Sequence, residues 1–265
     1  MLRRLPLVGA VILLAVASVQ AQWVTVTLPN TPRTADGKPD LTAPVPRLSD
    51  GKPDLSGIWM RVRPNRRDNG ANSNIHDFMS DGVTAPLRPE FEALYRQRRD
   101  VLLGSGRPSE QCLPHGIPDA MFPNAAQFKI IPTPAVTLVL YEEFNQFRQI
   151  HTDGRSLPPE TQPAWWGYSV GHWDGDTFVV ETRGFNDRTW LDDTGHPHTD
   201  KMRTTERFHR VDFGHMTLDV TIDDAGAYTA PFSLRVNLEL QPDTELIEFI
   251  CENEKDADRI RAATK

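Results

Sequence analysis

The stretch HMTLDVTID, residues 215–223, alternates apolar and polar side chains without interruption. Every second residue from Met216 to Ile222 is apolar, which is the period of a strand with one buried face. The stretch FSLRVNLEL, residues 232–240, repeats the pattern. These two stretches predict neighbouring antiparallel strands that each bury one face.

Segments of the same kind run through the second half of the chain, separated by turn signals such as Asp153-Gly154 and Asp174-Gly175. Eight or more strands joined by short turns close most easily into an up-and-down barrel. We therefore expect an all-β, mainly antiparallel barrel. Its further strands are expected at 136–143, 147–152, 166–173, 176–183, 203–211 and 245–251.

Two helices are expected beside the barrel. The segment 87–104 contains helix formers between Pro89, in a first-turn position, and a terminal Gly104. The segment 253–264, NEKDADRIRAAT, predicts a short C-terminal helix. One helix therefore precedes the predicted strands and one follows them.

The first 21 residues have the features of a secretory signal peptide. Arg3 and Arg4 precede an apolar run, and small residues near Ala21 predict the cleavage site. We therefore expect a secreted or periplasmic protein. No other stretch reaches the ~18 apolar residues of a membrane span, so no membrane insertion is expected.

Residues 22–54 are rich in Pro, Asp and Thr, and the hexapeptide DGKPDL occurs there twice, starting at Asp36 and Asp50. This composition predicts an extended linker or strap. Apolar sequence begins only after the second copy, so we expect one β-barrel domain over residues 55–265.

The net charge of the chain limits the classes of partner that it is expected to bind. The formal net charge of −7 becomes −9 after cleavage, when 27 basic residues face 36 acidic ones, and this acidity argues against nucleic acid as a partner.

Export permits a disulfide between Cys112 and Cys251. The bond would close a loop of roughly 140 residues and would contribute ~4–5 kcal/mol to stability in the chain-entropy model. The alternative is two separate buried thiols.

Two resemblances follow from short motifs. SGIW at 56–59 is similar to the G-x-W on the first strand of lipocalins and other calycins, which implies a lipocalin-like barrel with Trp59 plugging one end. The chain also resembles a family of secreted bacterial proteins of uncharacterised function. That resemblance implies no activity, but it implies that His198, not His196, is the histidine of its motif. The motifs are DGKPDLSGIW at 50–59, QCLPHGIP at 111–118, RQIHTDGR at 148–155, WDGDTFVVETRGFND at 173–187 and WLDDTGHPHTD at 190–200.

The segment 184–202 joins two predicted strands and has no period of its own. Loops of this length in compact domains are usually functional or disordered, and Trp190 argues against disorder. We therefore expect it to pack across the barrel mouth, with Asn186 and Trp190 near a ligand. The alternative is an ordered loop without a site. Trp166 offers a further aromatic surface for a sugar ring.

Candidate acid–base residues lie in and near these loops. His151 and Asp153 form a minimal histidine–carboxylate pair, and His198 is a second candidate for proton transfer. Arg155 would bind an anionic group. The alternative for 151–155 is a hairpin turn with a surface ion pair.

Glu206 suits acid catalysis only if its strand face points inward, where burial would raise its pKa, and strand parity leaves this open. Glu181 has the same ambiguity, and an inward Glu181 would pair with an arginine such as Arg148.

We consider three functions. The first is an enzyme (lyase, hydrolase or isomerase) that acts on a small or carbohydrate-like molecule, in which Glu206 and Asp153 assist and Arg148 binds an anion. The second is a lipocalin-like carrier of a small apolar ligand. The third is a cupin-like enzyme with a metal on His196 and His198, which Pro197 disfavours because it breaks strand geometry. No cofactor motif is present, so no cofactor is expected, and the sequence does not predict an oligomeric state.

Overall fold

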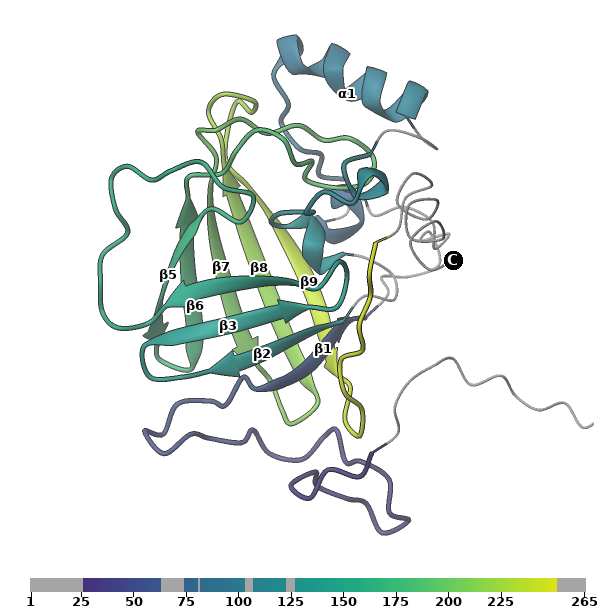
Figure 1. Ribbon diagram of the computed structural model, residues 1–265, viewed down its shortest axis with the longest axis vertical. Helices are drawn as coiled ribbons and strands as arrows, with labels where there is room; N and C mark the ends of the chain where they lie inside the picture. Colours follow the sequence, from purple (N-terminus) through teal and green to yellow (C-terminus); the bar gives the residue numbers. More distant parts are fainter. Residues whose placement is uncertain (1–25, 63–73, 81, 103–106, 123–126, 252–265) are drawn as a thin grey trace, which may run out of the picture.

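The computed structural model describes residues 26–62, 74–80, 82–102, 107–122 and 127–251, and Figure 1 shows its architecture. Nine strands form one closed barrel in chain order, which confirms the all-β, mainly antiparallel barrel. The strands are β1 Gly57–Arg61, β2 Phe128–Pro132, β3 Val136–Tyr141, β4 Gln146–His151, β5 Tyr168–Asp174, β6 Thr177–Arg183, β7 Arg203–Arg210, β8 His215–Asp223 and β9 Phe232–Leu240.

The connectivity departs from a pure up-and-down meander at one place. β4 and β5 pair in parallel, with Ile150 opposite Ser169, because the segment 152–167 carries the chain back before β5 begins. All other neighbours are antiparallel, including the closing pair of β1 and β9, in which Trp59 lies opposite Leu240. The barrel is therefore closed by its first and last strands.

Two expectations about strands need correction. β2 is a strand that the sequence pattern did not predict. The segment 245–251, expected as a strand, contributes only an isolated bridge between Glu143 and Phe249. The reason is that β1 already pairs with β2 on one side and β9 on the other, so the barrel has no open edge for another strand.

One α-helix is described, α1 Pro89–Leu102, and it begins at the expected proline. Three short 3-10 turns accompany it: η1 Ile75–Phe78, η2 Ser109–Gln111 and η3 Asp119–Met121. The expected signal peptide, 1–21, and the expected C-terminal helix, 253–264, lie outside the described residues. Within the described residues, every helix is too short or too polar to cross a bilayer.

The predicted alternation builds the core. On β8 the residues from Met216 to Ile222 alternate between buried and partly exposed, and on β9 every second residue from Phe232 is buried. Each fully buried side chain of this kind contributes roughly 1.5–3 kcal/mol. Trp59 is fully buried, and the guanidinium of Arg210 lies over its ring, 4.9 Å from the ring centroid.

The duplicated hexapeptide has a structural explanation. Each copy forms a turn whose glycine, Gly37 or Gly51, has a φ of +82°. In each copy the arginine three residues before the hexapeptide binds the carbonyl of that glycine and forms an ion pair with the barrel, Arg33 with Asp243 at 2.6 Å and Arg47 with Asp176 at 2.7 Å. The described strap therefore lies outside the barrel and is clamped to it twice.

The two cysteines form a disulfide, which confirms the expected pairing of Cys112 and Cys251, 139 residues apart. The bond fixes the segment 107–122 to the chain that follows β9. In Figure 1 this teal segment lies between α1 and the end of the barrel.

Candidate functional site

The crossover 184–202 is ordered by one buried carboxylate. Asp192 Oδ1 accepts the backbone N–H groups of Thr194, Gly195 and His196 at 3.0 to 3.1 Å. Its Oδ2 accepts the N–H of Ile75 at 2.8 Å and Nδ1 of His196 at 2.6 Å. Burial alone would raise the pKa of Asp192, but His196 and these N–H groups outweigh it and lower the pKa. Asp192 therefore fixes the loop and joins it to η1.

His196 is enclosed by rings. Tyr95 of α1 stacks on it with centroids 4.1 Å apart, and His76 of η1 meets it edge-on at 4.8 Å. With its Nδ1 bound to Asp192, His196 contributes to packing between α1, η1 and the crossover.

His198 has partners on both ring nitrogens. Nδ1 donates to the carbonyl of Thr199 at 3.2 Å, so Nε2 accepts the hydroxyl of Thr189 at 2.6 Å. Burial is the main reason why the pKa of His198 is lowered. Both ring nitrogens of this neutral imidazole are already hydrogen-bonded, so neither is left to bind a metal or to transfer a proton. The contacts of His196 and His198 therefore give no support to the predicted metal pair.

The other crossover residues expected near a ligand serve the loop itself. Asn186 accepts the N–H of Arg188 at 3.1 Å. Trp190 is buried, with the guanidinium of Arg98 of α1 4.9 Å from its ring. Their predicted role in substrate binding stays a prediction.

His151, Asp153 and Arg155 lie together at the end of β4. Arg155 binds Asp153 at 2.6 Å and the hydroxyl of Tyr168 at 3.0 Å. The hydrogen bond to Arg155 lowers the pKa of Asp153 to about 2, and burial with Arg155 lowers the pKa of His151. The contacts of His151 and those of His198 have no residue in common, so no shared contact joins the two expected proton-transfer groups.

Glu206 faces the barrel interior. This decides which face of its strand is buried, a question that the sequence left open. It forms a two-bond ion pair with Arg148 at 2.9 and 2.5 Å, and both side chains are buried. Arg148 also donates to Ser169 and Thr182. Glu181, the other candidate partner of Arg148, is exposed. The interior of the barrel thus contains a compensated charge pair.

A histidine that the sequence reasoning did not select lies at the barrel mouth. His115 is buried between two carboxylates, with Nδ1 2.5 Å from Asp119 of η3 and Nε2 3.2 Å from Glu143 of the β3–β4 turn. Burial alone would lower the pKa of His115, but the two carboxylates outweigh it and raise the pKa well above its ordinary value. The two carboxylates therefore favour the charged imidazolium form of His115.

A backbone contact joins this segment to the crossover. Gly116, next to His115, has a φ of +75°, and a Cβ placed there would lie 2.9 Å from Oγ1 of Thr189. Thr189 is the residue that binds His198. Glycine is required here both by its conformation and by the close approach.

A small polar hollow adjoins His115, with a free volume of about 10 Å³, which is the room that one water molecule needs. We call it the mouth hollow. Its lining residues are His115, Ala120, Gln127, Tyr141, Glu143, Phe144, Gln146 and Trp166. Trp166 stacks on Tyr141, with ring centroids 4.5 Å apart.

Three buried polar atoms on this hollow find no hydrogen-bond partner among the described residues, and His115 Nε2 and Glu143 Oε2, 3.2 Å apart, have only each other. Native proteins rarely leave such atoms unpaired, and clusters of them mark places where water or a ligand binds. The three atoms are Gln127 Oε1, the Tyr141 hydroxyl and Trp166 Nε1. The mouth hollow is therefore the best candidate site in the described part of the chain.

Residues that could hold a metal overlap with this site. One ligand atom each of His115, Asp119 and Asp193 lies within 4.8 Å of the others. Yet His115 and Asp119 already bind each other, and Asp193 lies 3.5 Å from Arg107. Because these charges are compensated within the chain, we assign no metal to the site.

The sequence offered one signal for this site. His115 and Asp119 are four residues apart within and after the QCLPHGIP motif, a spacing that brings two side chains together in one helical turn. Glu143 could not be linked to them, because only the fold places the β3–β4 turn beside η3. Comparison with models of known protein families, with curated proteins and with solved structures finds no match.

Proposed function

We propose that this protein is an exported enzyme that transfers protons to and from a small polar molecule at the mouth hollow. The observation that carries the proposal is the set of three unpaired polar atoms beside the buried pair of His115 and Glu143. The histidine–carboxylate chemistry expected from the sequence is thus retained, and its location moves to residues 115–143.

The arrangement gives each group a role. Asp119 accepts Nδ1–H, which keeps the ring of His115 oriented and charged, so that Nε2–H can protonate a substrate oxygen. Glu143, 3.2 Å from that Nε2, can accept a proton from the same substrate. A proton given at one atom and taken at another is the chemistry of isomerases and lyases, which we favour within the expected classes.

Two further residues would position the substrate. The hydroxyl of Tyr141 and the amide oxygen of Gln127 face the place where a water molecule fits. The ring of Trp166, stacked on Tyr141, offers a flat apolar surface of the kind that holds sugar rings. A small hydroxylated molecule that places one oxygen in the hollow fits these groups.

A carrier of apolar ligands is less well supported. Such a protein needs an apolar cavity in its barrel, whereas here Arg148 and Glu206 lie inside, together with buried side chains such as Phe208, Leu218 and Val220. Export is supported by the disulfide and by the signal peptide that the sequence predicts.

The proposal is tested by incubating the full chain with a mixture of small metabolites and following their consumption by mass spectrometry. Glu143→Gln removes the proton acceptor at nearly constant shape, and Glu181→Gln is the matched control on an exposed strand position. We expect the wild type and Glu181→Gln to consume a hydroxylated compound and Glu143→Gln to lose at least about tenfold in rate, in the range of a lost acid–base group. Circular dichroism checks that each variant folds.

Two results would overturn this function. Equal turnover by Glu143→Gln and the wild type would remove the mouth hollow from the reaction. Turnover that disappears on addition of EDTA and returns with zinc would replace proton transfer by metal catalysis at His115, Asp119 and Asp193.

A further inference from the structure

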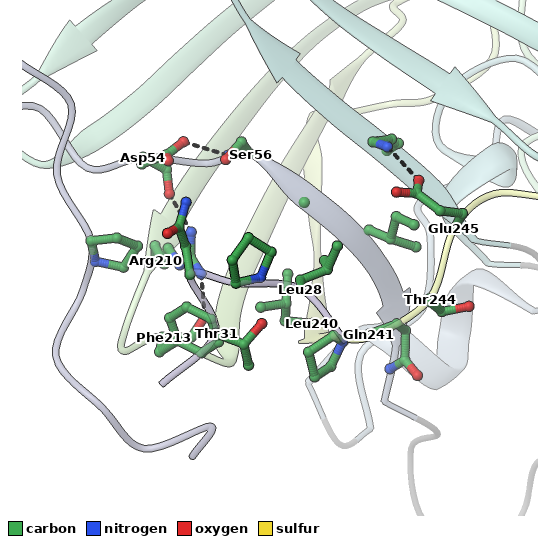
Figure 2. A pocket seen from close by; sticks show the side chains of 17 residues that line it. Leu28, Thr31, Asp54, Ser56, Arg210, Phe213, Leu240, Gln241, Thr244 and Glu245 are labelled. Carbon is green, nitrogen blue, oxygen red and sulfur yellow. Dashed lines mark hydrogen bonds and ion pairs between the residues drawn. The ribbon is translucent and has the colours of Figure 1, made fainter. Parts of the chain in front are cut away.

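A second hollow lies outside the barrel, beside the start of β1, where Trp59 is buried. Its volume is about 350 Å³, at the lower end of the size range of small-molecule pockets. The strap residues 28–31 form one wall, and the start of β1, the end of β9 and the segment 241–245 form the others. We call it the strap hollow. Figure 2 shows Arg210 and Phe213 on one side, Thr244 and Glu245 on the other, and Leu28 and Leu240 between them.

The strap hollow has one buried cation without a carboxylate partner. Arg210 donates to the carbonyls of Asp54, Phe213 and, at 3.2 Å, Asp212, and all three acceptors are neutral. A guanidinium has five N–H groups, so these bonds leave two without an acceptor among the described residues. Burial lowers the pKa of Arg210 to about 10, and the nearby carboxylates of Asp54 and Asp212 offset this only in part.

The acids near Arg210 are already engaged. Asp54 Oδ1 accepts the N–H of Ser56 at 2.8 Å. Asp212 Oδ1 accepts the N–H of His215 at 2.8 Å. Across the hollow, Glu245 pairs with Lys129 at 2.7 Å. Lys129 and Glu245 thus pair with each other, whereas Arg210, like Asp54, has no direct ion-pair partner among the described residues.

The rest of the lining has two features of a ligand site. Apolar surface predominates, supplied by Leu28, Ile58, Leu240 and several prolines. The hydroxyl of Thr244, which is only 9% exposed, has no hydrogen-bond partner among the described residues. The unpaired hydroxyl of Thr244 and the guanidinium of Arg210, whose charge is only partly offset, therefore both lie beside one apolar space.

We propose that the strap hollow binds a small organic carboxylate with an apolar body, such as a medium-chain fatty acid. The carboxylate binds the free N–H groups of Arg210, which arginine favours because its geometry matches that of carboxylates. The apolar body lies between Leu28 and Leu240. This site is separate from the mouth hollow, so it stands whether or not the proposed enzyme activity is found.

The strap completes the site. The N–H of Leu28 donates to Asp243 at 3.1 Å, and Arg33 binds the same carboxylate through two hydrogen bonds of 2.6 Å. These bonds hold the strap wall against the segment that contributes Thr244. The ion pair of Arg33 with Asp243 therefore supports the ligand site as well as the packing of the strap.

The test is calorimetric titration of the full chain with octanoate and, as the uncharged probe, octanol. We expect one saturable site for octanoate and binding of octanol weaker by at least about tenfold, because the charge-assisted hydrogen bonds are lost. Leu28→Glu places a carboxylate in the hollow without touching the stack of Trp59 and Arg210, so it should weaken octanoate binding by at least about tenfold. Val83→Glu, at an exposed apolar position elsewhere, is the matched control and should bind as the wild type does.

Three outcomes would contradict the proposal. The absence of saturable octanoate binding to the wild type would remove the site. Equal binding of octanol and octanoate would remove the role of Arg210. Unchanged octanoate binding to folded Leu28→Glu would place the ligand outside the strap hollow.

Discussion

Arg148 and Glu206 lie on strands that do not pair with each other, yet two hydrogen bonds of 2.9 and 2.5 Å join them across the barrel interior. Burial alone would lower the pKa of Arg148, but Glu206 outweighs it and raises the pKa. Arg148 therefore stays charged, and the pair links β4 to β7 through the core.

Removing one member of this pair should be more harmful than removing both. Glu206→Gln or Arg148→Met leaves one buried charge uncompensated, and we expect a loss of about 3–5 kcal/mol in the free energy of unfolding. The double variant should lose less than either single variant, and therefore far less than the sum of the two. Urea unfolding of the three variants measures this coupling, and strict additivity would show that the two charges do not depend on each other.

The disulfide should contribute strongly because its loop is long. Replacing Cys112 and Cys251 by serine should cost ~4–5 kcal/mol in the chain-entropy model for a sequence separation of 139 residues. Guanidinium unfolding of the oxidised wild type and the double serine variant gives the difference. A loss below about 1 kcal/mol would mean that the unfolded chain is already compact near these residues.

Two glycines with similar backbone angles should respond differently to alanine. Gly116 and Gly37 have φ angles of +75° and +82°, but a Cβ on Gly116 would lie 2.9 Å from Thr189, whereas nothing lies within 4 Å of one on Gly37. We expect Gly37→Ala to cost about 1 kcal/mol, from backbone conformation alone, and Gly116→Ala to cost roughly 1–3 kcal/mol more. Equal melting temperatures for the two variants would contradict the close packing of the mouth segment on the crossover.

His115 and His198 should shape the pH dependence of stability in opposite directions. The folded pKa of His115 is raised, so its contribution is complete below the unfolded value of 6.5 and is lost as the pH rises through the folded pKa. The folded pKa of His198 is lowered, so its contribution is present above 6.5 and is lost as the pH falls through the folded pKa.

Urea unfolding at pH 5 to 10 separates these effects. Relative to the wild type, His115→Gln should lose the alkaline decline, and His198→Gln should lose part of the acidic decline. Parallel profiles for the wild type and both variants would show that neither pKa changes on folding.

The strands that the sequence predicted best are those with one buried face. β8 and β9 alternate because one side packs in the core and the other faces solvent. β2 is short, ends in Pro132 and was missed. The segment 245–251 has strand-like residues, but its fate depended on whether the barrel had a free edge, which no local pattern reveals.

The site was less predictable than the fold. The inward face of Glu206 followed from its register with Val180 and Val220, which the sequence did not determine. His115 gains its chemistry from Asp119, four residues away, and from Glu143, which only the fold brings within 3.2 Å. Local spacing could have suggested the first contact, but the second is a product of tertiary structure.

The protonation state of His115 tests the central claim most directly. Nitrogen-15 NMR of the imidazole, followed from pH 5 to 10 in the wild type and in Glu143→Gln, reports both ring nitrogens. We predict that His115 in the wild type keeps both protons above pH 7 and loses one at a lower pH in Glu143→Gln. A neutral His115 at pH 7 in the wild type would contradict its role as the proton donor of the mouth hollow.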